Sequence, residues 1–387
     1  MYDFEKIYDR KGTGCYKYDA LNLYHKKENL IPLWVADMDF GIAPEITKAM
    51  QQRLEHPVYG YNFRLGHYYQ AFIEWIQIRH QWTITKDMIC NSPGIVPAIN
   101  FSLLEFTAPG DKIVIQEPVY TPFRETVLDH DRTLVVNELV QNVEDWTIDF
   151  KQLDKDLEGA KMFIFCSPHN PIGRLWTEGE LLQIGRLCKK HNVLIFSDEI
   201  HNDLILSERK HIPLATLEDF ADFTITGFAP SKTFNIPGLM TAAIIVPNEE
   251  INKRLKKFMF KLHMFAINSF GMVAFEAAFR HGIPWLNELL VQLRKNSQLV
   301  RDTLTSELPN IVIAKQEATY LAWLDLRYTG IGSKKINKLL IEKAGVALSP
   351  GTDFGPSGDG FMRLNFALQT SVLELALDRM VKTLKEI

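Results

Sequence analysis

The chain has 387 residues, of which 46% are hydrophobic and 23% charged, and its formal net charge is −4. This length and composition suit a globular protein with one large and one smaller domain. They argue against a nucleic-acid surface, a membrane span or a signal peptide, because basic clusters interleaved with aromatics, long apolar stretches and an apolar N-terminus are all missing from the sequence. The four scattered cysteines (Cys15, Cys90, Cys166 and Cys188) have no metal-ligand spacing, which indicates free thiols in a reducing cytoplasm and no metal site.

The middle of the chain alternates short β-branched runs with longer amphipathic stretches. We expect strands over residues 112–116, 134–138, 162–166, 193–197, 223–228 and 241–246, and a helix over 177–191. Strands that alternate with helices predict an α/β fold, with a mostly parallel sheet covered by helices on both faces. In such sheets a ligand binds beyond the carboxyl ends of the strands.

The C-terminal part has a different pattern. A long helix is expected from residue 283 to about 307, followed by strands over 321–326 and 362–366 and helices over 334–344 and 372–387. This order predicts a smaller α+β domain over residues 284–387. We expect the large domain to span residues 41–283, and the N-terminal segment 1–40 to pack with the small domain.

Three polar residues follow strand candidates at what would be one edge of the sheet: Asn170, Asp198 and Lys232. Apolar neighbours around Lys232 would remove its amine from water and lower its pKa, which favours a neutral amine that can act as a base. Asp198 ends a strand apolar enough to be buried, where a carboxylate needs a partner. Taken singly, these residues are also consistent with a surface lysine, a helix-capping aspartate and an Asn-Pro turn.

As a set, these motifs resemble the fold-type I pyridoxal-phosphate (PLP) enzymes, which include the class I/II aminotransferases. The resemblance implies that Lys232 forms a Schiff base with PLP, that Asp198 pairs with the pyridinium nitrogen and that Asn170 binds the ring hydroxyl. It also implies that Ile200 packs on one face of the ring and that Tyr120 stacks on the other.

The phosphate of such a cofactor needs an anion site. Gly94 and Ile95 precede a helical run over residues 97–106, where glycine permits close approach and the helix start offers unpaired N–H groups. We therefore predict that these two amides bind the phosphate and that Ser231 adds a hydroxyl; a plain helix cap is the alternative. The resemblance further implies that Tyr61 reaches the phosphate of a neighbouring subunit, and hence a homodimer with shared active sites.

The chain departs from the common aminotransferase pattern at several positions. Many relatives have an arginine eight residues after the lysine and a Ser or Thr three residues before it, whereas this chain has Met240 and Ala229. Other groups must then neutralise the phosphate. His201 stands where many aminotransferases have a tyrosine that is bonded to the ring oxygen. Arg363, which alternates with apolar residues on a strand candidate, is expected to bind a substrate carboxylate with its forked guanidinium; a surface arginine is the alternative.

Four stretches narrow the resemblance to the bacterial cystathionine β-lyase (C–S lyase) branch typified by MalY and PatB: residues 32–40, 197–201, 229–235 and 319–327. This resemblance covers nearly the whole chain. It implies a small amino-acid substrate, cystathionine or cysteine, which is cleaved to pyruvate, ammonia and a thiol. Transamination begins with the same removal of the α-proton, so an aminotransferase is an alternative. A regulatory binding protein that keeps the fold is another, although the intact Lys232, Asp198 and Asn170 argue against a purely non-catalytic role.

Overall fold

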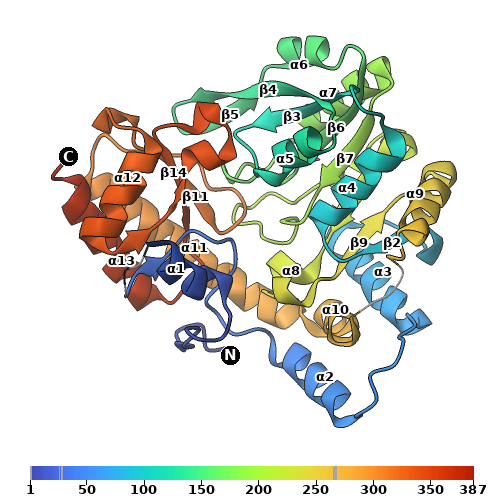
Figure 1. The fold of residues 1–387 in the computed structure, drawn as a ribbon, viewed down its shortest axis with the longest axis horizontal. Helices are drawn as coiled ribbons and strands as arrows, with labels where there is room; N and C mark the ends of the chain where they lie inside the picture. The colour runs from blue at the N-terminus through green and yellow to red at the C-terminus, as the bar shows by residue number, and fades with distance from the viewer. Residues whose placement is uncertain (1, 26, 28, 265–267) are drawn as a thin grey trace.

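Three β-sheets, of eight, four and two strands, and the helices packed on them build the fold, which Figure 1 shows as a computed structural model describing residues 2–25, 27, 29–264 and 268–387. The large sheet has the strand order β2-β9-β8-β7-β6-β3-β4-β5. Its strands are β2 (Ile89–Ser92), β3 (Lys112–Glu117), β4 (Thr133–Asn142), β5 (Asp145–Ile148), β6 (Ala160–Cys166), β7 (Leu194–Asp198), β8 (Thr224–Phe228) and β9 (Ala242–Ile245). The central pairs from β4 to β8 are parallel, and the outer pairs are antiparallel. The predicted α/β fold is therefore confirmed.

Helices cover both faces of this sheet because both faces of its central strands are apolar. On β3, for example, Ile113 and Ile115 pack in one cluster with residues of α4, α5 and α9, whereas Val114 packs in another with residues of α6 and α7. The helices are α1 (Leu21–His25), α2 (Pro44–Glu55), α3 (Gly66–His80), α4 (Ile95–Phe106), α5 (Pro122–Asp129), α6 (Phe150–Asp156), α7 (Glu178–His191), α8 (Pro230–Thr233), α9 (Glu249–Lys261), α10 (Ser269–His281), α11 (Ile283–Glu307), α12 (Ser333–Leu339) and α13 (Thr370–Leu384). Among the described residues, no helix is long and apolar enough to cross a membrane.

A smaller antiparallel sheet lies in the C-terminal part, on the left of Figure 1. Its strands, in spatial order, are β10 (Val312–Ile313), β11 (Leu321–Asp325), β14 (Phe361–Asn365) and β13 (Ser349–Pro350). Near the N-terminus, β1 (Ile31–Pro32) pairs in parallel with β12 (Val346–Ala347). The N-terminal segment therefore contacts the C-terminal part of the chain, and the proposed domain boundaries stay a prediction.

Two helices begin at or close to the residues that the sequence predicts. Helix α4 begins at Ile95, two residues earlier than expected, because Pro97 lies in the first turn, where its missing N–H group is not needed. Helix α7 begins with a capping box, in which Thr177 accepts from the Glu180 amide and the Glu180 carboxylate accepts from the Thr177 amide. Because α4 begins at Ile95, the amides of Ile95 and Val96 belong to its first turn, next to the site described below.

Candidate active site

A cavity of about 430 Å³ lies at the carboxyl ends of the central strands of the large sheet. Asp198 is the last residue of β7, Lys232 lies in α8 directly after β8, and Arg363 comes from β14 of the small sheet. Of the eleven site residues predicted from the sequence, eight line this cavity: Ile95, Tyr120, Asn170, Asp198, Ile200, His201, Lys232 and Arg363. The structure thus brings together residues that lie up to 268 positions apart in the chain.

The other three predicted residues do not line the cavity. Gly94 is the N-cap of α4, next to Ile95, and Ser231 lies beside Lys232 in α8. Tyr61 is fully exposed on the surface. The first two are adjacent to cavity residues, whereas Tyr61 has no place in the cavity of its own chain. Its assigned role at a neighbouring subunit stays a prediction.

Lys232 carries the amine that faces the cavity. Its Nζ donates a hydrogen bond to the backbone oxygen of Ala36, at 2.7 Å. Removal from bulk water, and then the positive charge of Arg363, lower the pKa of the Lys232 amine to about 8, although the carboxylates of Asp37 and Asp198 oppose this change. A substantial fraction of the amine is therefore neutral near pH 8, as a nucleophile or base requires.

Asp198 is a buried carboxylate whose pKa is shifted in the direction opposite to that of Lys232. Burial raises its pKa to about 7, although its Oδ1 accepts a hydrogen bond from the Ile200 amide at 3.1 Å. Lys232 lowers this pKa to a smaller extent. Charging the carboxylate is thus unfavourable in the free protein, and a cationic ligand beside it would offset that penalty. His201, which is also buried, has its pKa lowered to about 3 by desolvation, and its Nδ1 has no hydrogen-bond partner among the described residues.

Arg363 provides a fixed guanidinium at the small-domain side of the cavity. Its Nη2 donates to the backbone oxygen of Trp34 at 2.7 Å and to Ser349 Oγ at 3.2 Å. Its Nη1 donates to Asn170 Oδ1 at 3.2 Å, which leaves the Asn170 amide nitrogen available to donate to a ligand. Burial lowers the Arg363 pKa to about 10. A buried, pre-oriented guanidinium of this kind suits a carboxylate ligand.

Sequence reasoning missed several residues that line the cavity. They are Tyr16, Trp34, Val35, Ala36, Val96, Thr121, Pro122, Glu125, Cys166, Ser349, Asp353 and Phe354. Four of them (Tyr16, Trp34, Val35 and Ala36) come from the N-terminal segment and Thr121 from a loop, where no periodic pattern indicates which side chain faces inward; the others lie at the ends of helices and strands or in short 3-10 turns. Ser349 pairs directly with Arg363 in the small sheet, and this strand pairing, which the sequence does not reveal, places it at the site.

The donors and acceptors around the cavity fit PLP. Ile95 and Val96 line it at the first turn of α4, which contains no acidic residue, so their amides are available to a phosphate. Asp198 offers an anion for a ring nitrogen, and Lys232 an amine for an aldehyde. Among the described residues, no lysine or arginine other than Lys232 and Arg363 lines the cavity, so the amides at the start of α4 would be important donors to the phosphate.

An α/β fold with a lysine, an aspartate and an arginine facing one cavity at the strand ends defines a class of PLP-binding proteins. The chain belongs to the family aminotransferase class I and II, whose model matches residues 28–380. It is 40% identical to cystathionine beta-lyase PatB of Bacillus subtilis (strain 168) over 380 residues, which are 97% of this chain and 98% of that protein.

Two solved structures are similarly close. Cystalysin from Treponema denticola, which contains a pyridoxal 5'-phosphate cofactor, has a TM-score of 0.97 and 35% identity and covers 100% of this chain and 99% of its own. The PLP-bound C–S lyase from Staphylococcus hominis has a TM-score of 0.92 and 33% identity, and the match covers 99% of this chain and 98% of that one. The resemblance to the C–S lyase branch is therefore confirmed.

Proposed function

We propose that this protein is a PLP-dependent C–S lyase that cleaves a sulfur amino acid, cystathionine or cysteine, to pyruvate, ammonia and a thiol. One observation carries the proposal: a single cavity holds the amine of Lys232, the buried carboxylate of Asp198 and the guanidinium of Arg363. The 40% identity to PatB over nearly the whole chain supports the lyase outcome.

Each of these residues has a distinct role at the cofactor end of the site. PLP, which Lys232 would hold until the substrate's amine replaces it, would supply an electron sink for the α-carbon of the substrate. Asp198 provides the negative charge that favours a protonated ring nitrogen, and the Asn170 amide donates to the ring oxygen. The amides of Ile95 and Val96, which line the cavity, bind the phosphate together with the amide of the preceding residue, Gly94. The Ser231 hydroxyl, beside Lys232, adds a further donor, and Ile200, Tyr120 and His201 surround the ring.

The remaining roles concern the substrate. Arg363 binds its carboxylate and so orients the α-carbon toward Lys232. Once the substrate's amine has replaced Lys232 on the cofactor, the lowered pKa of Lys232 would provide a neutral Nζ that accepts the α-proton. Loss of the thiolate from the β-carbon then completes the elimination.

The decisive assay is incubation of the purified protein with cystathionine, followed by measurement of pyruvate and free thiol. We expect both products without an added keto acid, and neither from the Lys232→Ala variant. The family also includes aminotransferases, which would require a keto acid as the second substrate and would form no thiol. Absence of pyruvate and thiol from the PLP-loaded protein would reject the lyase.

Attachment of the cofactor has its own test. The loaded protein should be yellow, and borohydride should fix the cofactor covalently to Lys232. A borohydride-trapped adduct on another lysine of the Lys232→Ala variant would show that the wrong amine had been assigned.

We further propose a cytoplasmic homodimer in which Tyr61 completes the phosphate site of the partner subunit. The exposed apolar residues Val58, Tyr61, Phe63 and Leu65 support an interface in this region, and the free thiols of all four cysteines suit a reducing compartment. If both Lys232→Ala and Tyr61→Ala are inactive, mixing them through unfolding and refolding should restore about a quarter of the activity, because half of the dimers would contain one intact site. Mixing without recovery, or an active monomer, would contradict the shared site.

A further inference from the structure

The segment from Trp34 to Met38, here called the 34–38 strap, is held through five consecutive backbone carbonyl groups. Trp34 O accepts from Arg363 and Ser349, Val35 O from Asn365, Ala36 O from Lys232 and Tyr320, Asp37 O from Lys17 and Asn365, and Met38 O from Arg10 and Asn235. Each of these donors is a side chain, and most lie far away in the sequence. Loss of any one donor therefore leaves the strap fixed at its other carbonyl groups.

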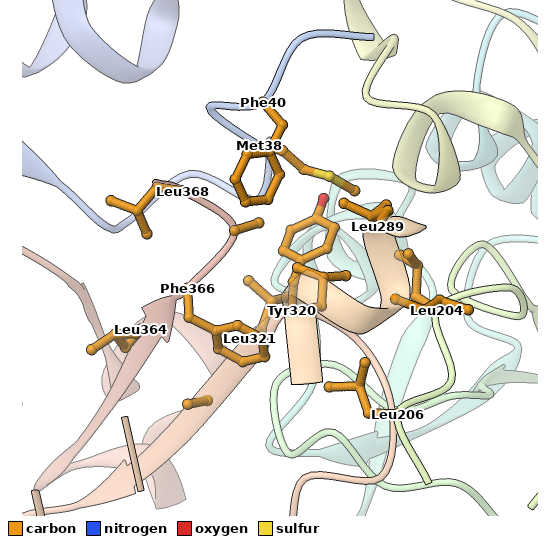
Figure 2. Close-up of a cluster of buried hydrophobic side chains, with 14 of the residues drawn as sticks. Met38, Phe40, Leu204, Leu206, Leu289, Tyr320, Leu321, Leu364, Phe366 and Leu368 are labelled. Carbon is orange, nitrogen blue, oxygen red and sulfur yellow. The ribbon is translucent and has the colours of Figure 1, made fainter. Parts of the chain in front are cut away.

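The Ala36 oxygen occupies a special place in this segment because it binds the proposed base. It accepts from Lys232 Nζ at 2.7 Å and from the Tyr320 hydroxyl at 2.9 Å. A carbonyl oxygen has two lone pairs, so these two donors use its full capacity. The Tyr320 ring is completely buried, and Figure 2 shows it among apolar side chains that include Met38, with its hydroxyl pointing toward the segment that carries that residue.

We propose that the Ala36 carbonyl oxygen holds the Lys232 amine in its working position and stabilises its ammonium form, and that Tyr320 is a positioning residue that sets how strongly this oxygen binds the amine. The role in turnover rests on the proposed lyase reaction. There the α-proton moves from the substrate carbon to Nζ, the C–H electron pair forms the Cα–Cβ double bond, and the Cβ–S pair leaves with the thiolate. The ammonium formed at Nζ then lies against an acceptor that is already in place.

The other groups that influence Lys232 act at longer range than this contact. Asp37 on the strap and Asp198 on β7 raise its pKa, whereas Arg363 on β14 lowers it. His201 keeps a low pKa of about 3 and stays neutral, and burial keeps the Tyr320 hydroxyl protonated by raising its pKa. The Ala36 oxygen is a neutral acceptor, so a change at this oxygen alters the Lys232 pKa without adding or removing a charge.

Two changes to this oxygen should shift the amine in opposite directions. Replacement of Asp37 by its α-hydroxy acid turns the Ala36–Asp37 amide into an ester, whose carbonyl is a poorer acceptor, and the Asp37 N–H that it removes donates to no group of the described residues. We expect the Lys232 pKa to fall by about half a pH unit or more. Tyr320→Phe removes the competing donor, so the oxygen binds the amine more strongly and the pKa should rise by roughly 0.3–0.5 pH unit.

The readout is the rate of acetylation of Lys232 as a function of pH, followed by peptide mass spectrometry in the full-length protein freed of cofactor. Tyr68→Phe is the matched control, since this buried tyrosine donates its hydroxyl to Asn91 Oδ1 at 3.1 Å, away from the strap. Its Lys232 should titrate as in the unaltered protein. The ester variant keeps every side chain, so it tests the proposal even if Tyr320→Phe fails to fold.

An unchanged Lys232 pKa in the ester variant would overturn the proposal. Lys232 pKa shifts of the same sign in the ester variant and in Tyr320→Phe would overturn it as well. The outcome is independent of the substrate assay because it is measured without cofactor or substrate. Opposite shifts together with an absence of pyruvate from cystathionine would reject the lyase and leave the role of Ala36 standing. Pyruvate formation without a change in the Lys232 pKa would support the lyase and reject the role of Ala36.

Discussion

Replacement of Asp198 by asparagine should stabilise the cofactor-free protein while weakening its hold on PLP. The folded protein raises the pKa of this carboxyl from 3.8 to about 7, mainly by burial. The folded state therefore binds the proton more tightly than the unfolded state, and this group makes folding less favourable as the pH rises from about 4 to about 7. Above pH 7 the penalty is constant.

The size of the effect follows from the same values. A difference of about three pH units corresponds to about 4 kcal/mol, which is the upper limit of the stability that Asp198→Asn can regain at pH 8. At pH 4 the gain should be close to zero, because the carboxyl is then largely protonated in the folded state. Urea unfolding of both cofactor-free proteins at pH 4, 6 and 8 measures this difference directly.

Asp325→Asn provides a control of opposite sign. Its hydrogen bonds with Arg327 and Gln141 lower the pKa of the Asp325 carboxyl despite partial burial, so this substitution should destabilise the protein at pH 8. With PLP bound, Asp198→Asn should lose about 2–5 kcal/mol of cofactor affinity, because one partner of a buried charge pair is gone. A stability difference between Asp198→Asn and the unaltered protein that does not change between pH 4 and pH 8 would refute the argument from burial.

Three further predictions follow from the site and its support. The rate at which PLP attaches to Lys232 should rise about tenfold per pH unit up to a plateau near pH 8, as absorbance should show; a rise that continues to pH 10 would indicate an amine with the pKa of an exposed lysine. Arg363→Lys should raise KM for cystathionine about 10- to 100-fold with a smaller change in kcat, because the forked contact is lost; an unchanged KM would place the carboxylate elsewhere. Trp323→Ala should lower the free energy of unfolding by about 3–5 kcal/mol in urea, since this buried ring stacks on Phe361 at 5.2 Å; a loss below 1 kcal/mol would show that the small sheet repacks.

The parts of the site that the sequence predicted share one property: they are tied to regular elements. Asp198 ends an apolar strand, and Asn170 and Lys232 follow two others, so the rule for ligand sites in parallel sheets predicts that all three lie at one edge. The prediction of the anion site rested likewise on a regular element, since Gly94 directly precedes helix α4. The helix itself began two residues earlier than expected, because a proline is tolerated in the first turn and is a poor guide to the exact start.

The parts that the sequence did not predict depend on long-range packing. The contact between Tyr320 and Ala36 joins residues 284 positions apart, and a backbone carbonyl has no residue type by which to recognise it. A weaker signal was present in the small sheet. Arg363 and Asn365 are polar residues two positions apart on a buried strand, so they share one face, and both donate to the 34–38 strap. Such a pattern predicts that polar groups pack on this face of β14, but it does not identify the 34–38 strap as their source.

The electrostatics of the cavity without its ligand explain why these groups belong to one site. Burial moves Asp198 and Lys232 toward their neutral forms, with pKa values of about 7 and 8, so neither charge is fully compensated inside the protein. A ligand that places a cationic ring nitrogen by Asp198 and consumes the amine of Lys232 relieves both penalties at once. The same burial that makes the carboxylate unfavourable for folding therefore contributes to binding. A surface aspartate and lysine at the same spacing would titrate normally and have no such preference for a cationic aldehyde.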